Sequence, residues 1–265
     1  MFYQAISHVF LRRRPRPYAF LGRGVRLLIV GLLLTVSLTG LTGCRIRSFL
    51  STRQEVNLGK EASRQVEQEY RVDTISSDAE RVRRVGSSLL PHMDRRDMPY
   101  SFKVIDAREI NAFSLPGGPV YVYRGLLDMM GDDNDALACV VGHELGHING
   151  RHVARAISSQ YATNILIGLA IPNATSQNIA GLVADIVNLK YSRDDEYDAD
   201  RRGLSYAHFA GYDPEGMVRF FHKLQRLEKR EGGGGPEWLR SHPLTGARIQ
   251  RAESIIAHND FRYGQ

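Results

Sequence analysis

"VVGHELGHINGRH", Val140 to His152, is the stretch of sequence that decides the fold. His143 and His147 are four residues apart, and Glu144 follows the first of them. Positions i and i+4 of an α-helix lie on one face, so both imidazoles can bind one metal ion. In the pattern H-E-x-x-H they bind zinc, and the glutamate takes a proton from the water that zinc activates. The apolar run "ALACVV" ahead of His143 favours a packed helix over a solvated one.

The pattern needs a further protein ligand. In one class of such sites a third histidine follows, but Val153 stands at its position. His152 falls one residue short and would point about 100° away on a continuing helix, so we interpret it as a polar helix-end residue. The other class uses a glutamate from a later helix, and Glu196 in "SRDDEYDAD" meets this need, unless that segment is only a solvated acidic face. Asp200, one turn further, is well spaced to accept a hydrogen bond from His143.

Charge is unevenly distributed along the 265 residues, whose formal net charge is +6. Residues 1–43 hold six arginines and no acidic residue, and the rest of the chain holds 29 basic and 29 acidic residues. This balance gives no reason to expect nucleic-acid binding. The length suits one good-sized domain with accessories, and no linker separates two globular parts.

The N-terminal region has the features of a secretory signal. A basic segment precedes the apolar stretch Leu27–Leu38, which is too short for a membrane span of about 20 residues. "LTGC", Leu41–Cys44, resembles the bacterial lipobox, in which the cysteine is acylated and becomes the first mature residue. We therefore expect residues 1–43 to be a lipoprotein signal segment, Cys44 to carry lipid, and 44–53 to form a tether. An uncleaved signal anchor is the alternative.

Periodicity and turn residues predict a mainly helical chain with a few strands. Ser77 with Glu80 forms a capping-box pattern at the start of a helix. A helix capped by Asp133 or Asn134 should run through the histidines towards Ser158. The other expected helices lie at 54–70, around 191–204, from 213 and at 245–257, and the strands at 100–106 and on both sides of the Pro–Gly–Gly turn in 111–125.

The sequence also predicts where two apolar stretches and one cysteine lie in the fold. Residues 165–171 and 179–189 are each too short to cross a bilayer. We interpret them as a core-facing loop and as the start of the helix that carries Glu196, with a membrane-facing or substrate-facing surface as the alternative. Cys139, one turn before His143, is expected to be a buried core thiol.

Five stretches give the chain a resemblance to a known family. They are "NAFSLPGGPVYVYRGLL", "GHELGHINGRH", "YSRDDEYDADRRGL", "AGYDP" and "SHPLTGARI". In order and spacing they resemble the zinc metallopeptidases that include the CaaX prenyl endopeptidase and HtpX, peptidase family M48. The resemblance extends from Gln54 to Ala257 and is closest to the soluble, periplasmic, lipoprotein-type bacterial members.

This resemblance implies a fold and a set of site residues. The fold would be α+β and mainly helical, a zincin-like (gluzincin) core with a small β-sheet beside the active-site helix, in a single metallopeptidase domain at 54–265. The ligands of one Zn²⁺ ion would be His143, His147 and Glu196, with Glu144 as general base and acid. His242 would stabilise the oxyanion or fill an open metal position at rest, with Arg248 near the site. Asn111, Val120, Tyr121 and Val122 would line the cleft, where an exposed edge strand binds an extended peptide.

The expected function is a zinc-dependent endopeptidase that cleaves misfolded or unassembled envelope proteins. Its partners would be polypeptide substrates, the membrane through lipid on Cys44, and outer-membrane assembly factors. By family analogy, Arg45 rather than aspartate after the cysteine indicates the outer membrane, with the protein facing the periplasm. The rival hypothesis is a non-catalytic, zinc-stabilised chaperone or assembly factor. Glu144 favours catalysis, because a closed structural zinc site has no use for it.

Overall fold

The computed structural model describes residues 50–161, 176–230 and 235–262 of the chain. The predicted signal segment, Cys44, most of the tether, the apolar stretch 165–171 and most of the glycine run lie outside these residues. The described helices are α2 (Thr52–Glu69), α3 (Ser77–Leu89), α4 (Arg124–Met130), α5 (Asn134–Asn149), α6 (His152–Tyr161), α8 (Ser176–Val187), α9 (Arg193–Phe209), α10 (Glu215–Arg230), α11 (Trp238–Ser241) and α12 (Gly246–Ala257), with a 3₁₀ turn at Leu90–His92.

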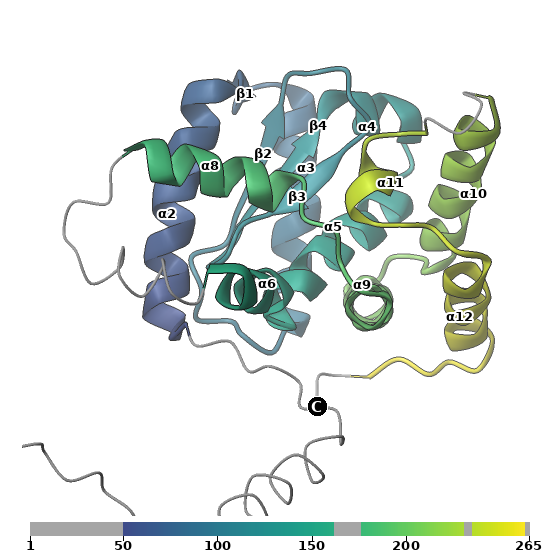
Figure 1. Ribbon diagram of the computed structural model, residues 1–265. Helices are drawn as coiled ribbons and strands as arrows, with labels where there is room; N and C mark the ends of the chain where they lie inside the picture. The colour runs from purple at the N-terminus through teal and green to yellow at the C-terminus, as the bar shows by residue number, and fades with distance from the viewer. Residues whose placement is uncertain (1–49, 162–175, 231–234, 263–265) are drawn as a thin grey trace, which may run out of the picture. The chain divides into compact units, whose positions relative to one another are not determined.

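A small mixed sheet lies between two groups of helices (Figure 1). Its strands run in the order β1 (Val72–Asp73), β2 (Ser101–Ile105), β4 (Pro119–Tyr123), β3 (Ala112–Ser114). β2 and β4 are parallel, whereas β1 and β3 pair antiparallel with their neighbours. The predicted fold, mainly helical with a small sheet beside the helix that carries the histidines, is confirmed.

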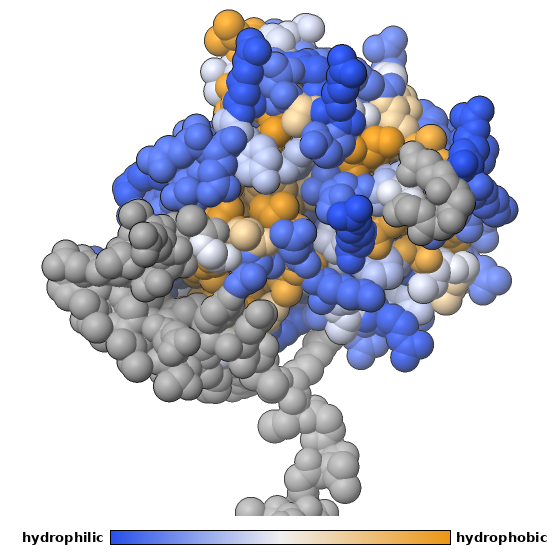
Figure 2. Space-filling model, turned by 45° about the horizontal axis from the view of Figure 1, so that its top comes forward, coloured by the Kyte–Doolittle hydropathy of each residue, from blue (hydrophilic) through white to orange (hydrophobic). Residues whose placement is uncertain are grey.

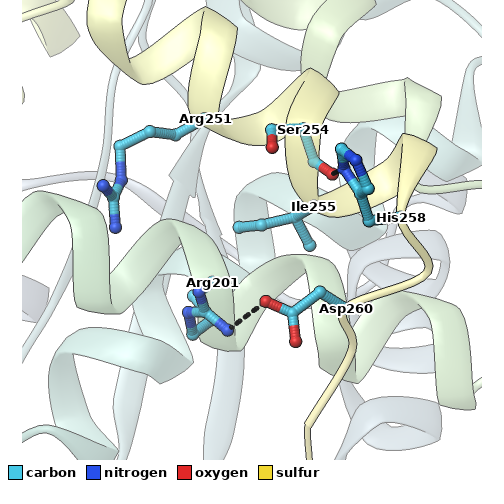
Figure 3. Close-up of a pocket in the computed structure, with 6 residues that line it drawn as sticks. All are labelled: Arg201, Arg251, Ser254, Ile255, His258 and Asp260. Atoms are coloured by element: carbon cyan, nitrogen blue, oxygen red, sulfur yellow. Dashed lines mark hydrogen bonds and ion pairs between the residues drawn. The ribbon is translucent and has the colours of Figure 1, made fainter.

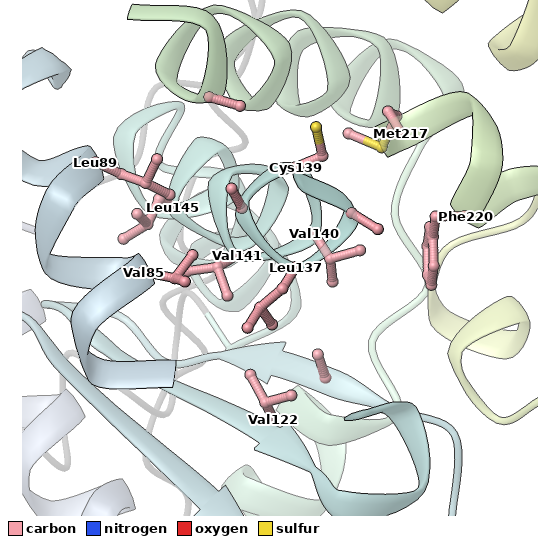
Figure 4. Close-up of a cluster of buried hydrophobic side chains, with 14 of the residues drawn as sticks. Val85, Leu89, Val122, Leu137, Cys139, Val140, Val141, Leu145, Met217 and Phe220 are labelled. Atoms are coloured by element: carbon pink, nitrogen blue, oxygen red, sulfur yellow. The ribbon is translucent and has the colours of Figure 1, made fainter. Parts of the chain in front are cut away.

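The sheet separates two hydrophobic cores. One face packs with α3 and α5, and α10 packs on α5; Figure 4 shows Val85, Val122, Leu137 and Phe220 among the side chains of this core. The other face packs with α2, α6 and α8. Cys139 belongs to the first core and is fully buried, as predicted, and burial raises the pKa of its thiol.

The sequence predicts an exposed edge strand at Val120–Tyr123, and this prediction is wrong. β4 pairs with β2 on one side and with β3 on the other, so its backbone has no free edge. Val120 and Val122 face one core, whereas Tyr121 and Tyr123 face the other. Apolar residues on both alternating faces are typical of a strand covered on both sides. The edge strand on this side of the sheet is β3.

α5 and α9 touch through their backbones. A Cβ on Gly203 would lie 2.7 Å from the backbone nitrogen of His143, and a Cβ on Gly146 would lie 2.8 Å from the carbonyl oxygen of Ala199. Real Cβ atoms do not approach other atoms so closely. Glycine at these positions therefore lets the two helices meet without side chains between them, which brings residues of α9 next to the histidines of α5.

The predicted helix through the histidines is two helices. α5 ends at Asn149, and Arg151 adopts a left-handed conformation with φ of 57° before α6 begins at His152. Few residues other than glycine adopt this conformation, and Arg151 is held there by contacts with the carbonyl of Leu50 and with the buried carboxylate of Glu55. His152 consequently leaves the spiral of α5 and turns back towards it.

Two other helix starts also differ from the predictions. The cap of α3 is Ser76, one residue earlier than predicted, and its side chain accepts from the backbone N–H of Ala79. The apolar stretch 179–189 does not continue into the helix of Glu196, because α8 ends at Val187 and Ser192 caps α9. Of the two predicted caps of α5, Asp133 is the one observed, and the predicted start of the last helix at Thr245 is confirmed.

The described surface is largely polar. On the face shown in Figure 2, charged side chains protrude and apolar ones lie in the gaps between them. Ile75 is the one large hydrophobic residue that is exposed in the described ranges. No helix among the described residues is both long and apolar enough to cross a bilayer.

α12 packs along α9 and leaves a small hollow beside it (Figure 3). The hollow measures about 230 Å³, and an ion pair of 3.0 Å joins Arg201 to Asp260 at its edge. It is lined by Arg201, Arg251, Ser254, Ile255, His258 and Asp260. None of these belongs to the histidine cluster described below.

Candidate metal centre

Four side chains converge in the interior and offer ligand atoms within 4.8 Å of one another. His143 and His147 come from α5, Glu196 comes from the first turn of α9, and His242 follows α11. Nε2 of His143 lies 3.0 Å from Nε2 of His147 and 3.1 Å from Nδ1 of His242. All four residues are buried. The structure thus brings together the three predicted ligands and the predicted histidine of "SHP".

The second nitrogen of His143 faces an acidic side chain. Nδ1 lies 2.9 Å from Oδ1 of Asp200, as the spacing on α9 predicts. A carboxylate only accepts, so Nδ1–H donates and Nε2 keeps its lone pair. Burial opposes the charged form, but the bond to Asp200 and the charge of Glu196 outweigh it, and the pKa of His143 is raised. The pocket therefore attracts positive charge to this imidazole.

The second nitrogen of His147 faces a third imidazole. Nδ1 of His147 lies 2.9 Å from Nδ1 of His152, and Nε2 of His152 lies 3.1 Å from Oδ2 of Asp198. Burial lowers the pKa of His147 well below its ordinary value, which favours the neutral ring. The prediction that His152 is only a polar helix-end residue is wrong, because its ring is buried against His147.

Arg248 neutralises the two carboxylates on α9. Its Nε and Nη2 each donate to Asp200 at 2.7 Å, and Nη1 contacts Glu196. Burial favours the neutral carboxyl, but the charges of His242 and Arg248 outweigh it and hold the pKa of Glu196 well below its ordinary range. Nη1 also donates to the carbonyls of His242 and Pro243. The guanidinium therefore joins α9 to the segment that carries His242.

The arrangement of donors and acceptors fits a metal ion. When His143 and His147 donate through Nδ1, both Nε2 atoms present lone pairs to each other across 3.0 Å. The ionised carboxylate of Glu196 adds Oε1 at 3.4 Å from Nε2 of His147. Lone pairs gathered at such distances repel unless a cation lies among them. Two imidazoles and one carboxylate are the protein ligands in one class of catalytic zinc site.

Glu144 lies beside this cluster, and its carboxylate makes no hydrogen bond with the described residues. It is fully buried, and neither oxygen has a hydrogen-bond partner within the described part of the chain. Oε1 lies 3.5 Å from Nε2 of His242. A buried carboxylate in this state is costly unless a ligand or water completes its bonding. Its position suits proton transfer next to the cluster.

Aromatic rings hold His242 in place. Trp238 lies nearly parallel to the imidazole, with centroids 4.7 Å apart, and Tyr191 stacks on it at 5.1 Å. Tyr191 also stacks on His147 at 3.8 Å, and its backbone N–H donates to the carbonyl of Ser241. The segment ahead of α9 and the segment ahead of His242 therefore close over the cluster together.

The predicted cleft residues lie at the sheet rather than at the cluster. Asn111 is buried at the start of β3, where its side-chain oxygen accepts from the backbone N–H of Ala112. Val120, Tyr121 and Val122 are fully buried in β4, inside the sheet.

Sequence reasoning does not identify His152, Asp198, Trp238 or Tyr191 as parts of the site. For His152 a signal exists in "NGRH", because an Asn–Gly pair after an apolar helix marks a helix end. A new start at His152 changes the direction of its side chain. No comparable local signal places Trp238, because its contact with His242 depends on the path of the chain around α11.

Known proteins resemble the chain across this site. The model of "Peptidase family M48" matches residues 76–256. The beta-barrel assembly-enhancing protease of Escherichia coli (strain K12) is 29% identical over 224 residues, which cover 80% of this chain and 46% of that protein. Metalloprotease LoiP of the same organism is 27% identical over 208 residues, covering 76% of this chain and 80% of LoiP. The mitochondrial metalloendopeptidase OMA1 of Arabidopsis thaliana is 34% identical over 140 residues, covering 53% and 28%. The chain spans about half the length of the first of these relatives.

Proposed function

The chain belongs to peptidase family M48, and on that premise we propose that it is a zinc-dependent endopeptidase of the bacterial cell envelope. The observation that carries this proposal is the cluster of His143, His147 and Glu196 with the unpartnered carboxylate of Glu144 beside it. The names of the relatives support it, since they describe metalloproteases and a metalloendopeptidase.

In this proposal His143, His147 and Glu196 hold one zinc ion. When bound, zinc polarises a substrate carbonyl and lowers the pKa of water. Glu144 accepts the proton of the attacking water as the carbon–oxygen bond forms, and it returns the proton to the amine as the carbon–nitrogen bond breaks. Asp200 orients His143, and Arg248 keeps Asp200 and Glu196 ionised and in place. The contacts of Arg248 favour this positioning role over a direct bond to the oxyanion.

We further propose that the described state is a resting one. A catalytic zinc site keeps one position open, yet here His242 brings a fourth ligand atom to the cluster. Its other nitrogen lies beside Glu144, so the imidazole stands where substrate and water would react. Turnover then requires that His242 move away, after which it can stabilise the oxyanion.

We place an extended peptide substrate along β3, the edge strand nearest α5. Asn111 and Leu115 bond to β4, so the backbone groups of Ala112 and Ser114 point away from β4, where the N–H of Ala112 donates to the side-chain oxygen of Asn111. Such a strand can pair with a peptide by backbone hydrogen bonds. Both residues are buried in the described state, which agrees with a closed site.

The envelope location rests on the lipobox-like "LTGC" and on the name of the first relative, which refers to β-barrel assembly. Misfolded or unassembled envelope proteins are the proposed substrates, and outer-membrane assembly factors the proposed partners. A lipid on Cys44 would anchor the protein at the outer membrane, facing the periplasm. Labelled palmitate should enter the wild-type protein and not the Cys44→Ala variant. Equal labelling of both would exclude this anchor.

Glu144→Gln tests the catalytic role, because it keeps the shape of the side chain and removes the base. We expect zinc binding to persist and chelator-sensitive cleavage of casein to fall at least 100-fold, the lower bound for losing a general base. The same change in a His242→Ala background controls for latency. If neither wild type nor His242→Ala cleaves casein, that result would support the rival chaperone function. If Glu144→Gln cleaves as fast as its parent in both backgrounds, the mechanism is refuted.

A further inference from the structure

His152 and Asp198 form a hydrogen-bonded chain behind one of the proposed zinc ligands. Nδ1 of His152 lies 2.9 Å from Nδ1 of His147, and its Nε2 lies 3.1 Å from Oδ2 of Asp198. His152 is buried, with an exposed fraction of 2%. The two histidines are five residues apart, and the left-handed Arg151 between the helices turns the second ring back onto the first. The contact is therefore a product of the helix break.

When the ring of His152 is neutral, as its burial favours, one placement of the protons satisfies these contacts. Asp198 accepts, so the Nε2–H of His152 donates to it, and Nδ1 of His152 is left as an acceptor. The Nδ1–H of His147 must then donate to His152, which leaves Nε2 of His147 with its lone pair facing the cluster. This is the tautomer that a zinc ligand needs at Nε2.

Neighbouring residues fix the positions of His152 and Asp198. Asp198 also accepts from Nε of Arg202 at 2.9 Å, and Arg202 in turn bonds to Asp94 at 2.7 Å. Gly150 makes room for the ring, because a Cβ there would lie 2.2 Å from Nε2 of His152 and 2.8 Å from Oδ2 of Asp198. The carboxylate and the backbone both fit this one ring position.

We propose that His152 and Asp198 are positioning residues that fix the tautomer and orientation of His147 for zinc. The proposal rests on the proposed ligation by His147. His143 donates directly to a carboxylate, Asp200, whereas His147 reaches Asp198 only through a second imidazole. The two imidazoles of the H-E-x-x-H pattern therefore donate to different acceptors, His143 to a carboxylate and His147 to a neutral imidazole. Loss of such a supporting group weakens metal binding by roughly 10–100-fold.

Zinc affinity tests this proposal without an activity assay. The full chain is stripped of metal and titrated with zinc against a chromogenic chelator. His152→Phe fills the space but cannot accept from His147, so its Kd should rise by roughly 10–100-fold. His152→Gln offers an amide oxygen and should lose less. His208→Phe is the matched control, since His208 stacks on Phe261 instead, and it should bind zinc as wild type does.

Nitrogen NMR of the histidines in the zinc-loaded wild type needs no variant and therefore does not depend on whether His152→Phe folds. The expected signature is a neutral His152 protonated at Nε2 and a His147 protonated at Nδ1. A His152 protonated at Nδ1, or a wild-type Kd for folded His152→Phe, would overturn the proposal. His147→Ala separates it from the proposed function: if that variant also binds zinc as wild type does, the ligand assignment itself is wrong.

Discussion

Adding one methyl group at Gly203 should damage the metal centre from outside it. In Gly203→Ala the new Cβ would lie 2.7 Å from the backbone nitrogen of His143 and 3.0 Å from its Cα. Favourable contact between such atoms needs about 3.5 Å, so α5 and α9 must separate by roughly 0.8 Å. Glu196 lies two turns earlier on α9 and moves with it. Zinc ligands tolerate displacements of only about 0.2 Å.

The expected magnitudes follow from this displacement. Overpacking costs about 1–3 kcal/mol, and the better helix propensity of alanine returns up to about 1 kcal/mol. Gly203→Ala should therefore lower the free energy of unfolding of the metal-free protein by about 1–2 kcal/mol, or Tm by roughly 2–8 °C. Its zinc affinity should fall by at least about tenfold, the lower figure for a disturbed metal-supporting group.

Gly181→Ala is the matched control. Gly181 lies inside α8, and a Cβ there meets nothing within 4 Å. This substitution should leave zinc affinity unchanged and raise stability by about 0.4–1 kcal/mol. Calorimetry of the metal-free proteins and chelator competition measure both quantities. If Gly203→Ala matched wild type in Tm and in zinc Kd, the account of a backbone contact that sets the ligand geometry would be refuted.

Three further results are expected. At a free zinc concentration about a thousand times its Kd, adding a chelator should lower the free energy of unfolding by about 4 kcal/mol. A midpoint of unfolding that is the same with and without zinc would contradict the proposed site. Arg248→Ala leaves the carboxylates of Asp200 and Glu196 buried without their counter-charge, so urea unfolding should show a loss of about 3–5 kcal/mol. The hydrogen bonds from Arg219 hold the pKa of Asp133 below its ordinary value, so the stabilisation is present above about pH 4 and is lost as the pH falls through the folded-state pKa. Asp133→Asn keeps the helix cap, so its free energy of unfolding should lie only about 1 kcal/mol or less below that of wild type. In urea titrations this difference should shrink as the pH falls through that range. A difference that stays constant would count against the ion pair.

The features that depend on local spacing are predictable from the sequence. His143 and His147 converge because four residues make about one helical turn, and Asp200 meets His143 because it follows Glu196 at the same interval. The helix caps at Asp133 and Thr245 are local as well. Each cap and its partner lie three residues apart, and His143 with His147, like Glu196 with Asp200, share one face of one helix.

The features that depend on the path of the chain are not predictable in this way. β4 looks like an edge strand when only its turn with β3 is considered, but β2 pairs with its other side from 18 residues upstream. The alternation of valine and tyrosine in β4, apolar on both faces, is the clue to its central place. The contacts of Trp238 and Tyr191 with His242 likewise require the arrangement of three separate segments.

The buried thiol of Cys139 has a practical consequence for spectroscopy. It is the one free cysteine among the described residues, and its burial and raised pKa keep it from reacting as a thiolate near neutral pH. A cysteine introduced at an exposed position among the described residues can therefore be labelled with a maleimide dye while Cys139 does not react. Pairs of such labels would show by fluorescence energy transfer whether the His242 segment moves as proposed.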